Sequence, residues 1–268
     1  MAPDLEKSAL LGRRPDTSPR LPNPVPVGAT APLRWLALGW QDLIACGGRG
    51  MVYGAVFCLM GLAVSFVYAT RWQLTMGLSA GFFLLGPFVC AGIHDLSRQR
   101  ARGEPPSLRA SLLCWRRNPG SIAFFAAILT FAMVVWARVS VVIFALFSTT
   151  DFPDLQGVIL KIVSPANLEF LLVWFGAGLV FATLVFAISV VSMPLMLDRQ
   201  TDTLMSMFAS ARALAANPLP TALWAVLIVA LIGTSLVLWL PLLIITAPWV
   251  GHASWHAYRS MLAPDTEG

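Results

Sequence analysis

The stretch GPFVCAGIHDLSR, residues 86–98, decides the fold, because its pattern occurs twice more in the chain. In each copy an apolar run contains a proline and then ends in polar or basic side chains. The other copies read SMPLMLDRQTD, residues 192–202, and TAPWVGHASWHAYR, residues 246–259. Each copy ends a run that is apolar enough to belong to a membrane-crossing helix. The pattern predicts three transmembrane hairpins whose returning helices carry a proline near the cytoplasmic end.

The composition indicates a membrane protein. The chain is 57% hydrophobic and 12% charged, whereas soluble domains carry roughly 25% charged residues. The net charge of +5 does not indicate nucleic-acid binding, because the basic residues lie beside apolar segments, where they set topology and contact anionic headgroups. The four cysteines form no CxxC pair and predict free thiols.

A short amphipathic segment precedes each hairpin, so one unit occurs three times, at about residues 33–103, 104–201 and 202–262. In the first unit an apolar stripe lies opposite a polar face: Leu33, Leu36, Trp40 and Leu43 against Arg34, Gln41 and Asp42. Ser107 and Asp202-Thr203 begin the second and third units, and Asn118-Pro119 and Asn217-Pro218 break their amphipathic helices. The first unit has Gly47-Gly48 at that point, and the third hairpin is short, turning before Pro241.

The expected fold is an all-α, polytopic membrane bundle with six transmembrane helices. Residues 1–30 are proline-rich and predict a disordered cytoplasmic tail, residues 31–262 form the membrane domain, and residues 263–268 form a short tail. Arginines gather in the loops between units, whereas the outer loops hold only Arg71 and Lys161. The positive-inside rule therefore predicts a bacterial inner-membrane protein with both termini in the cytoplasm. An apolar helix on the outer surface is expected near residues 155–163.

Three segments are familiar: LRWLALGWQDL (33–43), VYGAVF (52–57) and GFFLLGPFVCAGIHDLSRQRARGEPPSLRASL (81–112). Together they resemble a family of uncharacterised bacterial integral membrane proteins, catalogued as a domain of unknown function, over roughly residues 33–261. The resemblance implies a six-span inner-membrane protein without an assigned activity. Some members carry the label cytochrome c oxidase subunit I. A haem–copper site needs about half a dozen histidines, and this chain has three, which excludes a catalytic oxidase subunit but not an accessory or assembly role.

Six polar residues near the inner ends of the returning helices stand at matched distances from the prolines. They are His94, Asp95, Asp198, Asp202, His252 and His256. If the units pack around a pseudo-threefold axis, these side chains converge near the inner face, and His and Asp at positions i and i+4 share one helix face, as in metal sites. The hypothesis is a cation or proton site. The alternative, which the sequence favours, is that they are the ordinary polar ends of spans; no metal or cofactor is predicted.

Arg138 interrupts an apolar run, and an arginine at the centre of a membrane raises the free energy of insertion by at least about 2.5 kcal/mol. Trp136 and Trp174 indicate the outer aromatic belt, which places Arg138 near the headgroups, where it can snorkel. Glu169 starts the next span at a similar level and is its expected partner. Structural snorkelling or pairing is one interpretation, and a substrate-binding role is the other.

No motif in the chain indicates an enzyme, because no nucleophile–base pair or outer metal site is apparent. The favoured function is a scaffold, assembly or envelope-homeostasis factor whose amphipathic helices contact anionic lipid or whose spans contact another membrane-protein complex. The alternative is a transporter or permease for a small or lipid-like solute. A cavity lined by the equivalent helix ends of the three units would favour transport, and a filled core would favour the scaffold.

Overall fold

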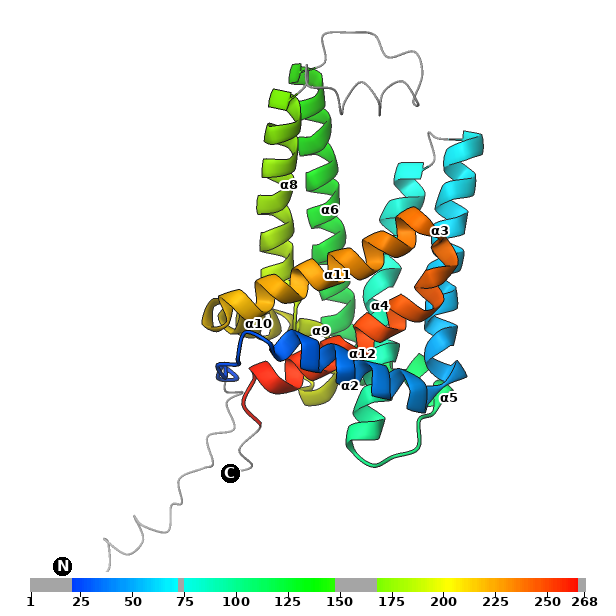
Figure 1. Ribbon diagram of the computed structural model, residues 1–268, viewed down its shortest axis with the longest axis vertical. Coiled ribbons are helices and arrows are strands. Elements are labelled where there is room, and N and C mark those ends of the chain that lie inside the picture. The colour runs from blue at the N-terminus through cyan, green and yellow to red at the C-terminus, as the bar shows by residue number, and fades with distance from the viewer. Residues whose placement is uncertain (1–20, 72–74, 148–167, 265–268) are drawn as a thin grey trace, which may run out of the picture.

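The computed structural model describes residues 21–71, 75–147 and 168–264, and this part of the chain is helical. The predicted outer-surface helix, residues 155–163, lies outside the described residues. Two hairpins stand upright and side by side in Figure 1: α3 (Gly48–Arg71) with α4 (Thr75–Ala101), and α6 (Pro119–Phe147) with α8 (Leu168–Ser189). The third hairpin crosses them obliquely and consists of α11 (Pro218–Leu238), the short η4 (Leu240–Leu242) and α12 (Leu243–Met261).

Shorter helices lie at the end of the bundle where α10 leads into α11 and α12 ends (Figure 1): α2 (Ala31–Cys46), α5 (Leu108–Leu112), η2 (Cys114–Arg117), α9 (Ser192–Arg199) and α10 (Thr203–Ala216). The predicted starts of α5 and α10 are confirmed. Ser107 and Asp202 are N-caps whose side chains accept the backbone N–H of Ala110 and Met205. α6 and α11 begin at the prolines of the two Asn-Pro pairs, where a missing N–H is harmless.

Four described segments are long and apolar enough to cross a membrane: Gly48–Val67, Pro119–Phe147, Leu168–Arg199 and Pro218–Leu238. The other two helices of the hairpins, α4 and α12, are not among them. The second half of α4 is polar and basic, and α12 has 19 residues, two of them histidines. The protein thus has several candidate spans, and the six-span topology stays a prediction.

The returning helix of the second unit, predicted as one run over residues 170–197, is broken in two. α8 ends at Ser189 and α9 begins at Ser192, next to the carbonyl of Val190, which the ring of Pro194 crowds and to which Pro194 has no N–H to donate. Ser210 of α10 satisfies the freed backbone: its hydroxyl lies 2.7 Å from the carbonyl oxygen of Ala187 and 3.4 Å from the N–H of Val191. In α4 and α12 the helix continues through the corresponding proline.

α12 is the central helix of the described fold and packs most extensively against α2, α3 and α4. A glycine allows each of these contacts. A Cβ on Gly39 of α2 would lie 2.6 Å from the backbone N of Ala253, and one on Gly54 of α3 would overlap the carbonyl group of Ile244. Gly251 of α12 is similarly close to the Ile93 side chain of α4. Small residues at helix crossings are typical of membrane proteins, where close backbone approach supplies the packing energy.

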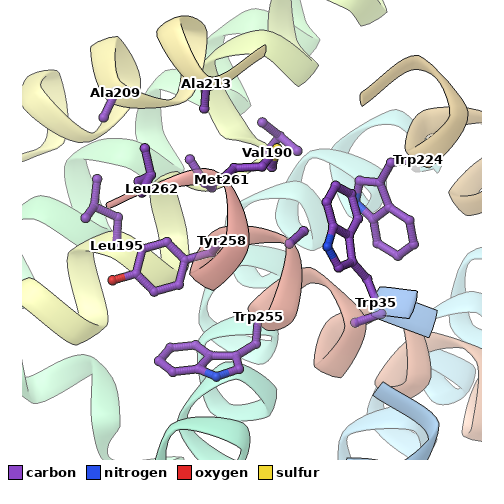
Figure 2. Packing of buried hydrophobic residues seen from close by; sticks show 13 residues of the cluster. Trp35, Val190, Leu195, Ala209, Ala213, Trp224, Trp255, Tyr258, Met261 and Leu262 are labelled. Atoms are coloured by element: carbon purple, nitrogen blue, oxygen red, sulfur yellow. The ribbon is translucent and has the colours of Figure 1, made fainter. Parts of the chain in front are cut away.

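The end of the bundle that carries the short helices, called the inner end because the sequence predicts that it faces the cytoplasm, is filled with side chains. Figure 2 shows a cluster in which Trp35 of α2 meets Trp224 of α11 edge-on, with ring centroids 5.8 Å apart, and Trp255 packs on Tyr258 at 5.3 Å. All four side chains are at most 2% exposed. This cluster joins the first and third units at the level where the chain ends meet.

The amphipathic helices expose part of their apolar stripes. On α2, Leu33 and Trp40 are exposed, whereas Leu43 of the same stripe is 2% exposed; on α10, Leu204 and Phe208 are exposed. The buried face of α10 consists of small or polar residues, and that of α2 combines Gly39 and Asp42 with the large side chain of Trp35. Exposed apolar side chains on short helices suit a lipid interface. Because Asp42 stands on the buried face of α2, it lies inside the protein.

Residues 21–30, which the sequence assigns to the disordered tail, are held against the rest of the chain; residues 1–20 lie outside the described residues. The N–H of Val25 donates to the carbonyl oxygen of Met261 at 2.8 Å, and that of Ala263 donates to Asn23 at 3.0 Å. Asn217 holds the same segment: its Oδ1 accepts the N–H of Val27 at 2.7 Å, and its Nδ2 donates to the carbonyl oxygen of Val25 at 3.1 Å. Residues 21–27 are thus held in place, contrary to the expectation, because Asn217, Met261 and Ala263 bind them.

Asn217→Ala should therefore release residues 21–27 and destabilise the protein by about 1–3 kcal/mol, the usual cost of leaving buried hydrogen-bonding groups unpaired. The measurement is amide hydrogen exchange of Val27, which should accelerate. Asn118→Ala is the matched control, since Asn118 precedes Pro119 in the same way but donates to Met196 and Thr201. Unchanged exchange of Val27 in Asn217→Ala would contradict the clamp.

Candidate functional site

Asp42 of α2 is the centre of a polar cluster between α2, α4 and α12. Its Oδ2 accepts hydrogen bonds from Ser97 at 2.6 Å and from Nε2 of His256 at 3.0 Å, and its Oδ1 accepts one from Arg100 at 2.8 Å. The Ser97 hydroxyl lies 2.7 Å from Nδ1 of His252. Because an ionised carboxylate can only accept, Ser97 donates to Asp42, and Nδ1 of His252 donates to Ser97. This assignment leaves Nε2 of His252 as a buried acceptor with no partner among the described residues.

The surroundings keep Asp42 ionised. Burial by itself raises the pKa of the Asp42 carboxyl, but the hydrogen bonds from His256 and Ser97, together with the charge of the two nearby histidines, lower it by more. The resulting pKa lies below the ordinary value for aspartate. At neutral pH the carboxylate therefore accepts all three donors at once.

Asp95 of α4 forms a second cluster and is fully buried. Its Oδ1 lies 2.7 Å from Nη2 of Arg98 and 3.1 Å from Nη1 of Arg117, and its Oδ2 accepts a hydrogen bond from Gln99 at 2.7 Å. Arg117 belongs to η2, the start of the second unit. The cluster therefore ties the returning helix of the first unit to the second unit.

Asp198 of α9 forms a third cluster, at the edge of the first two units. Its Oδ2 accepts a hydrogen bond from the hydroxyl of Tyr258 at 2.8 Å and lies 3.6 Å from Arg259, both on α12. Its Oδ1 lies 3.5 Å from Arg102 at the end of α4. Both arginines are about half exposed, so these two longer ion pairs contribute little, and Tyr258 makes the firmest contact.

Three carboxylates thus close a ring of contacts between the units. Asp95 joins the first unit to the second through Arg117, and Asp198 joins the second to the third through Tyr258. Asp42 joins the third to the first through His256. The polar layer, defined by Asp42, Asp95, Asp198 and their partners, holds the inner ends of the three units together.

The six residues that the sequence singles out lie at the inner end of the bundle but do not meet in one place. His252 and His256 belong to the Asp42 cluster, whereas Asp95 and Asp198 belong to the other two. Asp202 caps α10, and His94 is buried, with Nδ1 unpartnered among the described residues. In the same part of the chain, no three His, Cys, Asp or Glu side chains are placed to hold a metal ion.

A cavity of about 870 Å³ lies between the three hairpins, within the range of roughly 300–1,000 Å³ typical of small-molecule sites. On α4, Cys90 and His94 line it, and on α12 Gly251 and Ser254 do, so the cavity borders the polar layer. Its walls are mostly apolar and include Phe57, Leu129 and Ile232. The proline-flanking parts of all three returning helices contribute to its lining, within residues 86–94, 189–194 and 247–254.

Arg138 and Glu169 lie on α6 and α8, and both side chains are exposed. No ion pair joins them in the described part of the chain. Trp136 and Trp174 do lie together, with ring centroids 5.7 Å apart, and Trp174 donates to Ser140 at 2.6 Å. An exposed arginine beside this aromatic pair fits the interpretation that Arg138 snorkels toward the headgroups.

Sequence reasoning missed Ser97, Arg100, Arg117 and Tyr258 as members of the polar layer. Each stands where helix ends are ordinarily polar, so composition alone does not distinguish it. One signal was available for Ser97, because it follows Asp95 within the repeated motif of residues 86–98.

Residues 74–198 match the model of a family described as "Predicted integral membrane protein (DUF2189)", a family of unknown function. The resemblance expected from the sequence is thereby confirmed over these residues. No curated protein and no solved structure shows a significant match to the chain.

Proposed function

We propose that this protein binds a lipid-like solute in its central cavity and acts as a non-enzymatic carrier or permease. The observation that carries the proposal is the cavity itself, which lies between all three hairpins and is lined by the equivalent proline-flanking segments. Transporters place solutes between repeated units in this way. The mostly apolar lining selects a solute that is itself largely apolar.

The proposal includes the topology read from the sequence: six spans in three units, in the bacterial inner membrane, with both termini in the cytoplasm. Two observations support it. Arg98, Arg100 and Arg117 all lie in the polar layer, at the end expected to face the cytoplasm. The hydrogen bond between Val25 and Met261 also keeps the two chain ends on one side.

The polar groups of the cavity support binding rather than catalysis. The hydroxyls of Ser65, Ser189 and Ser254 each donate to a carbonyl oxygen of their own helix, which leaves them poorly placed to attack a substrate. Cys90 and His94 are one helical turn apart and both line the cavity. No hydrogen bond joins them in the described part of the chain, whereas a nucleophile and its base require that reach.

A second candidate function is the scaffold or assembly factor, in which the outer surface rather than the cavity acts. The exposed apolar side chains of α2 and α10 carry it, because Leu33 and Phe208 are 54% and 65% exposed. Exposed arginines on the same helices, Arg34 and Arg212, would contact anionic headgroups. Under this function, filling the cavity would leave activity unchanged.

Gly86→Phe tests the proposal, because Gly86 lines the cavity and an added Cβ there meets nothing within 4 Å. The ring would occupy the space of the solute without displacing backbone. In vesicles, purified wild-type protein should bind dodecanoic acid carrying an NBD fluorophore at its chain end, measured as saturable fluorescence enhancement. The variant should bind it at least ten-fold more weakly.

Gly176→Phe is the matched control, since a Cβ on Gly176 also meets nothing within 4 Å but this residue does not line the cavity. It should bind the probe as the wild type does. Absence of saturable binding to the wild type, or equal binding to both phenylalanine variants, would sink the proposal and favour the scaffold.

A further inference from the structure

The helices that line the cavity form a ring with one weak seam. Within the described residues, α3 packs on α4, α4 packs on α6, and α6 packs on α8. α11 is connected to α3 through η4 and α12. The remaining neighbours are α8 and α11. Both line the cavity, with Val185 and Ser189 on α8 and Ile228 and Ile232 on α11, yet these two helices make few contacts with each other.

The seam arises because the third hairpin leans toward the first unit. In Figure 1, α11 starts beside α10, at the inner end of the bundle, and runs diagonally toward the outer part of α3, while α8 stays upright. Gly61 allows Leu240 of η4 to lie close to α3, since a Cβ on Gly61 would lie 3.0 Å from the Leu240 side chain. The short connection at η4 and the close approach of Gly54 to Ile244 hold the hairpin in this direction.

The seam is closed at its inner end. Val190, directly after α8, belongs to the same buried cluster as Trp224 of α11 (Figure 2), and Phe186 and Ile228 pack against it. Ser210 of α10 binds the backbone at the end of α8. An opening between α8 and α11 therefore leads away from the inner water and toward the middle of the bilayer.

The outward-facing side chains of both helices are apolar. Leu179, Val180 and Leu184 on α8 and Val226 and Val229 on α11 are all more than 60% exposed. Both helices are also candidate spans. The surroundings of the seam are therefore hydrocarbon, which water-soluble molecules enter only at a large cost.

We propose that the seam between α8 and α11 is a lateral entrance through which the solute passes between the bilayer and the cavity. This inference rests on the proposed function and narrows its substrate class. The solute is a membrane-dissolved amphiphile, such as a single-chain or two-chain lipid, that enters with its apolar part in hydrocarbon throughout. A water-soluble solute of similar size would have no path through this seam.

The test narrows the seam with two large side chains, Val185→Trp and Ile232→Trp in one variant. Both positions line the cavity, one on each side of the seam. The control variant carries Val180→Trp and Val229→Trp on the same two helices, at exposed positions outside the cavity lining. Stopped-flow mixing of vesicles with the NBD-labelled dodecanoic acid would measure the rate at which the probe reaches the cavity.

A lateral entrance predicts that the seam variant loads and releases the probe at least ten-fold more slowly than wild type, while the control variant matches wild type. Competition by an unlabelled membrane lipid, but not by a water-soluble acid of equal charge, should displace the probe. Equal loading rates in both double variants would overturn the entrance while leaving the cavity intact. A wild type that binds no probe would instead overturn the proposed function, so the two failures are distinguishable.

Because the added rings could disturb folding, the affinity of the seam variant is measured after long incubation. Because Val185 and Ile232 also line the cavity, the affinity is expected to fall, and the release rate separates the two effects. A narrowed path slows release as well as loading, whereas a filled cavity alone speeds release. A lost affinity with an unchanged loading rate would contradict the entrance, since the rings would then act on the cavity and not on access to it.

Discussion

Replacing Gly54 with alanine should lower the free energy of unfolding by about 3 kcal/mol or more, the upper end for overpacked cores. Gly54 of α3 faces the backbone of α12, where an added Cβ would overlap the carbonyl group of Ile244. A side chain can rotate away from such a methyl group, but a helical carbonyl cannot, so α3 and α12 must move apart. α12 also meets α2 through Gly39 and Ala253, and moving it would loosen that contact as well. Unfolding of the purified protein by SDS in mixed micelles, followed by circular dichroism, measures the loss.

Gly176→Ala controls for the substitution itself. A Cβ on Gly176 meets nothing within 4 Å, and alanine is up to about 1 kcal/mol better than glycine inside a helix. The same change should therefore be neutral or slightly stabilising on α8 and strongly destabilising on α3. If Gly54→Ala were as stable as Gly176→Ala, α12 could not be the tightly packed central helix that Gly39, Gly54 and Gly251 indicate.

The local beginnings of helices were predictable from the sequence, because short-range chemistry decides them. Asn118-Pro119 and Asn217-Pro218 predict breaks, and α6 and α11 begin at these prolines. The sequence did not reveal that both asparagines also clamp a passing chain segment. Asn118 donates to Thr201, just before α10, and Asn217 to Val25, just before α2. The clamped residues are 83 and 192 positions away, beyond the reach of any local pattern.

The candidate site was predictable only in part, for a reason specific to membranes. The matched spacing from the prolines located the polar layer and named Asp95, Asp198 and His256. It missed the role of Asp42, because burial in a bilayer protein does not follow hydrophobicity: apolar residues face lipid, and small or polar residues face other helices. Asp42 therefore resembles a water-facing residue in sequence and is 7% exposed in the structure. The cavity had no sequence signal, because it results from the direction in which the third hairpin leans.

The three hairpins are joined firmly at one end of the molecule and unevenly along their length. At the inner end, three carboxylates join the units in a closed ring, and α12 completes it by packing on α2. Farther out, two of the three junctions between hairpins pack well, whereas the junction of α8 with α11 does not. A short third hairpin cannot contact both of its neighbours along its whole length. Under the proposed function, such a bundle would admit a solute from the bilayer between α8 and α11 while the contacts at its inner end keep the hairpins together.

Asp42→Ala should be the most damaging change in the polar layer, with a loss of about 3 kcal/mol, in the range for removing one partner of a buried charge pair. The variant leaves Arg100, His256 and the Ser97 hydroxyl without their shared acceptor. Since these three groups lie on α4 and α12, the first and third units would lose their polar connection. SDS unfolding measures the stability, and exchange of amides in α2 reports the detachment.

The dependence on pH gives this prediction a second, independent readout. The pKa of Asp42 is lowered in the folded protein, so its contribution is complete above the unfolded value of about 3.9 and is lost as the pH falls through the folded value. The stability difference between wild type and Asp42→Ala should therefore persist from pH 7 to about pH 4 and close below it. Asp202→Ala is the matched control, because Asp202 only caps α10 and its removal should cost about 1 kcal/mol. Equal losses in the two variants would mean that the Asp42 cluster is a surface feature, whereas a three-fold larger loss at Asp42 would establish that it fastens α2 to the core.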